Sequence, residues 1–69
     1  MSNLLEKAQE LRRLRIEFGY TIMSLSNEIQ MSQITIGRAE RGHKVSKTSV
    51  KMIAEFFGIP ISSISNFDD

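Results

Sequence analysis

Most of the chain places its hydrophobic residues three and four positions apart, which is the spacing of amphipathic helices. No run of four or more residues alternates between apolar and polar positions with turn residues on both sides, as a half-buried strand does. The first helix is predicted over residues 4–18. Ser2 or Asn3 can cap its start, and Gly19 stands where a left-handed helix terminator belongs. Its apolar positions are Leu4, Ala8, Leu11, Leu14 and Phe18.

Two short helices are predicted next, each with a hydroxyl residue at its start. Thr21 is expected to cap a second helix that ends near Ile29. Ser32 is expected to cap a third helix over residues 33–41, and Gly42 supplies its stop. The pattern therefore indicates two capped helices joined by a turn of about three residues.

The fourth predicted helix follows the cap residue Ser46 and is closed by Gly58. Its apolar positions have the i, i+3, i+4, i+7 spacing and are Val50, Ile53, Ala54 and Phe57. Pro60 is expected to open a fifth helix of one or two turns over residues 61–67, with Ile64 facing inward. The sequence thus predicts an all-α, compact five-helix domain.

Length and composition agree with one small domain over residues 1–69. The absence of Cys excludes a disulfide framework and a thiolate zinc site. The longest run without a charge, residues 56–67, is shorter than the roughly 18 residues that a membrane-spanning helix needs. No signal-peptide pattern follows Met1. We therefore expect a cytoplasmic protein without membrane contacts.

Positive charge is concentrated in one part of the chain. The formal net charge is only +1, but residues 38–51 contain five basic residues and a single acidic one, Glu40. The remainder of the chain is net acidic. Such asymmetry favours one face that meets an anion, with a solvated basic loop as the alternative.

The two short helices over residues 21–41 have the spacing of a helix-turn-helix. Residues 11–64 resemble the Cro/CI-type (XRE) family of phage and bacterial regulators. The resemblance is carried by Leu11-Arg-Arg-Leu-Arg15, Phe18-Gly-Tyr-Thr21, Leu25-Ser26, Ile29, Met31-Ser32, Ile36, Glu40-Arg-Gly42, Ile53-Ala54 and Phe57-Gly-Ile59. Its most specific part is the Ser-x3-Ile-x3-Glu-Arg-Gly segment over residues 32–42.

The sequence departs from the family pattern at four positions. Ile22 stands where the family favours Gln, which removes one usual phosphate contact. Gln30 occupies a turn position that favours Gly, and it costs about 1 kcal/mol if its φ is positive. Ala39 replaces a larger aliphatic residue, and Val45 stands where Pro is common. None of these changes alters the expected fold.

The resemblance implies a lambda-repressor-like fold and a sequence-specific, DNA-binding transcriptional regulator. It further implies a small phage or mobile-element repressor that binds a two-fold operator in double-stranded DNA as a weak homodimer. Two alternatives remain, a protein–protein interaction module on the same scaffold and the excised N-terminal domain of a larger regulator. Of these readings we favour a small stand-alone DNA-binding protein. The sequence does not identify a protein antagonist.

Residues in the N-terminal half of the third helix would reach base edges first, because an α-helix fits the major groove. The candidates for base reading are Gln33, Ile34, Gly37 and Arg38. Gln33 can pair with adenine, Arg38 with guanine, and Ile34 can contact a thymine methyl, while Gly37 leaves room for close approach.

Phosphate contacts require positive charge, hydroxyl groups or the free N–H groups of helix N-termini. The candidates are Thr21, Ser32, Thr35, Arg41, His43, Lys44 and Ser46. Thr35 is equally well explained as an ordinary residue of the helix surface.

Two further sets of residues are expected to act structurally. By the same resemblance, Arg15 and Glu40 form a pair that ties the first helix to the end of the third. The candidates for dimer contacts in the last two helices are Phe56, Ile61, Ser65 and Phe67. Such a patch would be small, so association without DNA should be weak.

No catalytic site, metal site or cofactor is expected, and the chain is not predicted to be an enzyme. His43 is the only histidine, so neither a Ser/His/Asp arrangement nor a His-based metal site can be assembled. The Gly-His-Lys segment at 42–44 is not a phosphate-binding P-loop, which needs Lys directly after its second Gly.

Overall fold

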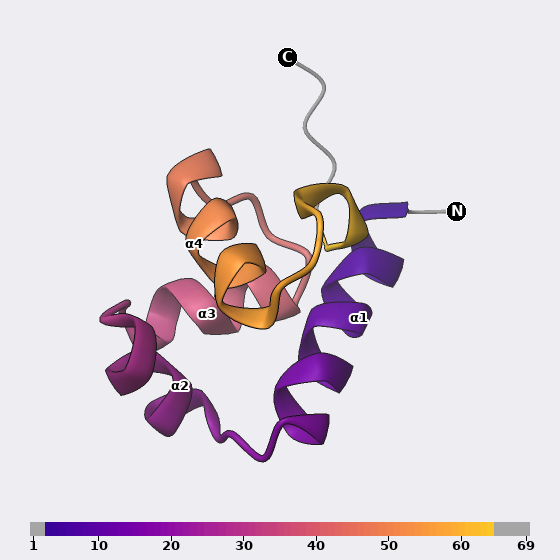
Figure 1. Cartoon of the computed structure of the whole chain (residues 1–69). Coiled ribbons are helices and arrows are strands. Elements are labelled where there is room, and N and C mark those ends of the chain that lie inside the picture. The colour runs from indigo at the N-terminus through magenta and orange to yellow at the C-terminus, as the bar shows by residue number, and fades with distance from the viewer. Residues whose placement is uncertain (1–2, 65–69) are drawn as a thin grey trace.

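The computed structural model describes residues 3–64, and this part of the chain contains helices and no strand (Figure 1). The elements in chain order are α1 (Asn3–Glu17), α2 (Ile22–Ile29), α3 (Gln33–Glu40), α4 (Lys47–Phe57) and the 3-10 helix η1 (Ile61–Ser63). The predicted all-α class is confirmed, and each α-helix begins and ends within one residue of its predicted bounds. Ser2, one of the two residues predicted to cap α1, lies outside the described residues, whereas Asn3 already belongs to the helix.

The predicted fifth α-helix is wrong within the described residues, because residues 61–63 form only a 3-10 turn. Its bonds run from Ser63 N–H to the Pro60 carbonyl and from Ile64 N–H to the Ile61 carbonyl, each 3.0 Å long. No side chain caps its start. Ile64 is buried, as predicted, and the rest of the predicted segment, residues 65–67, lies outside the described residues.

Hydroxyl side chains fix where α2, α3 and α4 begin. In each case the hydroxyl of the residue before the helix accepts a hydrogen bond from the backbone N–H three residues later. The pairs are Thr21 with Ser24 at 3.0 Å, Ser32 with Thr35 at 3.2 Å and Ser46 with Ser49 at 3.1 Å. These local signals explain why the helix starts could be predicted from sequence.

The turn between α2 and α3 contains the single non-glycine residue at positive φ among the described residues. Gln30 adopts φ 55° and ψ 52°, and its backbone N–H donates to the Ser26 carbonyl at the end of α2. The left-handed conformation costs an L-residue about 1–2 kcal/mol relative to the right-handed one. The predicted cost at this position is therefore present, and the fold tolerates it.

The core lies where all four helices meet. α3 packs against both α1 and α2, and α4 packs against α2 and η1 (Figure 1). Each of the four α-helices contributes one of the largest fully buried side chains of the core, which are Leu11, Leu25, Ile36 and Ile53. This arrangement holds α3 along one side and leaves its opposite side uncovered by the described residues.

Candidate nucleic-acid interface

The helix α3 presents one side to the core and the other to solvent. Ile36 and Glu40 are buried on the inner side. Gln33, Ile34 and Arg38 are exposed on the outer side. Ile34 is 71% exposed, more than any other large hydrophobic residue between positions 6 and 64. Three of the four predicted base-reading residues are thus accessible to a ligand.

The fourth, Gly37, lies on α3 as expected but does not leave the expected room. It is buried, and a Cβ added to it would lie 3.2 Å from Nη1 of Arg41. The space that was expected to admit a close approach of DNA is therefore filled by the Arg41 guanidinium. A base could contact Gly37 only if the Arg41 side chain, which is exposed, moved away.

A cleft of about 500 Å³ opens between α3 and the start of α4. Its lining residues are Thr35, Arg38, Lys44, Val45, Ser46 and Ser49. Two cationic and three hydroxyl side chains thus share one space, and this chemistry suits a phosphate group. The cleft brings one predicted base reader, Arg38, together with three predicted phosphate contacts.

Ser49 is a cleft residue that the sequence analysis did not select. Its backbone N–H donates to the Ser46 hydroxyl, and the two hydroxyl oxygens lie 2.9 Å apart in a hydrogen bond. Ser49 lies three residues after the cap residue Ser46, and the third residue of a helix lies beside the residue that caps it. This spacing would have identified Ser49 from the sequence.

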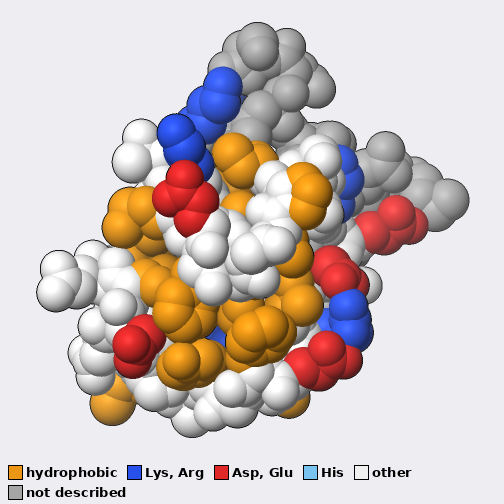
Figure 2. Space-filling model, viewed as in Figure 1, with side chains coloured by type: hydrophobic (Ala, Val, Ile, Leu, Met, Phe, Trp, Pro, Cys, Tyr) orange, Lys and Arg blue, Asp and Glu red, His pale blue; other side chains and the backbone are white. Residues whose placement is uncertain are grey.

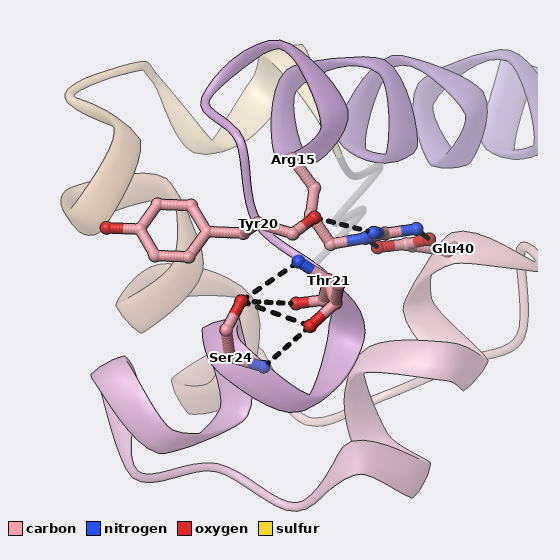
Figure 3. A network of polar contacts seen from close by, with 5 residues as sticks. All are labelled: Arg15, Tyr20, Thr21, Ser24 and Glu40. Atoms are coloured by element: carbon pink, nitrogen blue, oxygen red, sulfur yellow. Dashed lines mark hydrogen bonds and ion pairs between the residues drawn. The ribbon is translucent and has the colours of Figure 1, made fainter.

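The other predicted phosphate contacts are exposed, but two of them already serve as helix caps. Thr21 and Ser24 form a reciprocal cap in which the Thr21 N–H donates to the Ser24 hydroxyl at 2.9 Å (Figure 3). The Ser32 hydroxyl is likewise engaged by the N–H of Thr35. A phosphate at either place would share these hydroxyls with the helix caps.

The loop after α3 contains two more of the predicted phosphate contacts. His43 and Lys44 are both exposed, and the His43 backbone N–H donates to the Arg38 carbonyl at 3.0 Å. Gly42 has φ 81°, a conformation that glycine adopts at little cost, so the chain can reverse directly after the helix. This bond and turn hold the loop against the end of α3.

The orientation of α3 depends on a buried ion pair between Arg15 and Glu40 (Figure 3). Arg15 Nε donates to Glu40 Oε2 at 2.5 Å, and Nη2 donates to Oε1 at 3.0 Å. Arg15 Nη1 donates to the Tyr20 carbonyl at 2.9 Å. One side chain of α1 therefore holds both the end of α3 and the segment that leads into α2.

A helix-turn-helix family model matches residues 11–64 of the chain. The chain belongs to the Cro/CI-type (XRE) helix-turn-helix family. It is therefore a DNA-binding regulator of the XRE kind, and this family is regulatory and not enzymatic. Comparison with curated proteins and with solved structures gave no match.

Three of the four departures from the XRE pattern have a common structural explanation. Ile22, Ala39 and Val45 are partly buried and pack against the core cluster. An apolar residue at position 22 thus adds to the core where the family places an amide that contacts phosphate. The start of α2 in this XRE domain consequently offers its backbone N–H groups and Thr21, without that amide.

Two of the predicted dimer contacts belong to α4 and η1. These residues, Phe56 and Ile61, are partly exposed and pack against the core, while Ser65 and Phe67 lie outside the described residues. Phe56 makes edge-to-face contacts with Tyr20 and Phe57, at centroid distances of 5.5 and 5.2 Å. Figure 2 shows hydrophobic side chains gathered near the centre of one face of the molecule.

Residues 3–64 contain no group of three or more His, Cys, Asp or Glu side chains that is placed to hold a metal ion. Over the same range, no helix is long and apolar enough to cross a membrane.

Proposed function

We propose that this XRE-family chain is a small repressor of phage or mobile-element type. It binds a two-fold operator in double-stranded DNA as a weak homodimer in the cytoplasm. The observation that carries the proposal is the outer side of α3, where Gln33, Ile34 and Arg38 are exposed beside a cleft lined by cations and hydroxyls. Repression requires only that the bound protein occupy DNA that other proteins need.

In this proposal the three exposed residues of α3 enter the major groove. Gln33 bonds adenine, Arg38 bonds the O6 and N7 atoms of guanine, and Ile34 contacts a methyl group. The surrounding cations and caps hold the two flanking phosphate backbones. Those contacts are assigned to Thr21, Ser32, Thr35, Arg41, His43, Lys44 and Ser46, with Ser49 added from the cleft.

The dimer is proposed on the apolar surface around Phe56 and Ile61. A two-fold arrangement would place the same surface of each copy in contact, and it would present two α3 helices to successive major grooves. The partly exposed aromatic and aliphatic side chains supply a contact that is modest in area, which favours association on DNA over association in its absence.

Selection of bound sites from random DNA tests the proposal most directly. We expect enrichment of a two-fold symmetric sequence whose half-sites lie about 10 base pairs apart, centre to centre. A basic protein of unrelated fold serves as the control and should enrich nothing. No enrichment would contradict DNA reading and favour a protein-contact module, whereas an asymmetric single site would contradict only the dimer.

A further inference from the structure

Ile34 is an unusual residue for its place. It lies at the second position of α3, between the polar residues Gln33 and Thr35, yet 71% of it is exposed. An isoleucine cannot donate or accept hydrogen bonds, so it cannot read the polar atoms of a base edge or a phosphate. The apolar feature that the major groove offers is the methyl group on C5 of a pyrimidine.

Arg38 shares the outer face of α3 with Ile34. Four residues advance an α-helix by about 6 Å and rotate it by little more than one turn, so the two side chains form one stripe. Arg38 is exposed and lines the cleft, and its guanidinium can bond the O6 and N7 atoms of guanine. Successive base pairs lie about 3.4 Å apart, so this spacing covers two base-pair steps.

We propose that Ile34 and Arg38 act as one reader of a pyrimidine that carries a C5 methyl and lies within two base pairs of a guanine. The recognised group at the pyrimidine is the methyl itself. Thymine and 5-methylcytosine carry that methyl at the same place in the groove. They differ at C4, where thymine has the O4 oxygen and 5-methylcytosine has an amino group. The Ile34 side chain has no polar atom that could distinguish these two groups. Methylation of a cytosine at this position therefore strengthens binding.

This inference rests on the proposed function and names what one part of the site reads. Its first test uses the preferred duplex from random-site selection, with deoxyuridine replacing each thymine in turn, which removes only the methyl. We expect one position in each half-site where affinity falls about fourfold, as expected from loss of one buried methyl contact. At that position, a 5-methylcytosine duplex should bind about fourfold more tightly than the cytosine duplex.

Variants assign the effect to the residue. Ile34→Asn should abolish the penalty for deoxyuridine and the gain from 5-methylcytosine, while Ile34→Val, which stays apolar, should keep both. Arg38→Ala is the matched control on the same stripe, since it should lose the preference for guanine and keep the response to the methyl. Circular dichroism verifies that each variant is folded, as expected for residues exposed on α3.

The outcomes separate this inference from the proposed function. If the wild-type protein has a preferred site but binds equally well with deoxyuridine at every thymine, recognition of the methyl by Ile34 is contradicted. Sequence-specific DNA binding is then still supported. The same conclusion follows if Ile34→Asn keeps the response to the methyl. If selection from random DNA yields no preferred site, both the proposed function and the recognition of the methyl are contradicted.

Discussion

The guanidinium of Arg15 bonds both carboxylate oxygens of Glu40, which lies 25 residues later in the chain. The two side chains are only 10% and 6% exposed. Because a third bond reaches the Tyr20 carbonyl, the buried charges are well supplied with partners. No buried side-chain nitrogen or oxygen in the described residues lacks a hydrogen bond. This pair sets the position of α3, and with it the position of the residues that we propose to read bases.

Replacing Glu40 by Ala should therefore destabilise the fold strongly. The change leaves the Arg15 charge buried without its carboxylate, and such a loss costs about 2 kcal/mol or more. Glu55→Ala is the matched control, because it makes the same substitution at an exposed helical position and should cost under about 0.5 kcal/mol. Urea unfolding of both variants measures the difference. Equal losses would mean that the ion pair contributes nothing to the folded state.

The features that sequence predicted well are those with local causes. The helix starts depend on hydroxyl caps at Thr21, Ser32 and Ser46, and each cap acts over three residues. The pairing of Arg15 with Glu40 has no local cause, since hydrophobic spacing places each residue on a helix without saying which helices meet. Only the resemblance to the XRE family indicated that contact.

Two features escaped prediction because they depend on packing in three dimensions. The Arg41 side chain folds back over Gly37, and the conformation of a long exposed side chain is set by its surroundings and not by its spacing in the sequence. The segment after Pro60 makes a 3-10 turn that ends at the buried Ile64. Its apolar spacing was compatible with a helix, but the burial of one residue needs only a single turn.

Gln30→Gly should raise stability, because it removes the strain of a left-handed residue with a side chain. The expected gain is about 0.5–1 kcal/mol, since the greater flexibility of glycine in the unfolded chain offsets part of the relief. Gln30→Ala keeps the strain and should give no gain. Thermal unfolding of the three proteins decides the matter, and equal stability of the Gly and Ala variants would contradict a strained turn.

A contact between Arg13 and Glu10 on α1 should make the stability of the fold depend slightly on pH. The Arg13 guanidinium hydrogen-bonds Glu10, and this contact lowers the pKa of the Glu10 carboxyl below its ordinary value. A lowered pKa means that the contact stabilises the fold above the ordinary pKa of Glu and that this contribution is lost as the pH falls through the lowered pKa. Both side chains are substantially exposed, so screening by water keeps the effect small.

Arg13→Gln should therefore raise the pKa of Glu10 toward its ordinary value. Arg12→Gln is the control, because residues two positions apart on a helix do not face each other, and it should leave that pKa unchanged. A nuclear magnetic resonance titration of the Glu10 side-chain carboxyl carbon measures the pKa in each protein. An unchanged value in Arg13→Gln would show that the hydrogen bond is absent in solution.

Binding to the preferred DNA should depend steeply on salt. If the proposed dimer neutralises on the order of eight phosphates, the logarithm of affinity should fall against the logarithm of salt concentration with a slope of roughly −7. Titrations at several salt concentrations give this slope. A slope near zero would contradict the proposed phosphate contacts, and an equally steep slope on every sequence would reduce the protein to a non-specific binder.

Arg38 and Lys44 line the same cleft, but the proposed mechanism gives them different tasks. Arg38→Ala should cost about 1–3 kcal/mol on the preferred site and relax the preference at one base pair per half-site, because Arg38 bonds a base. Lys44→Ala should weaken binding to all sequences by similar factors and make the salt slope shallower by about one per lost contact. Binding curves for both variants on preferred and scrambled DNA, at matched salt, separate the two roles. The ratio of affinities for these two DNAs should fall in Arg38→Ala. If it stays unchanged, Arg38 contacts the DNA phosphate backbone as Lys44 does, and another residue of α3 must recognise guanine.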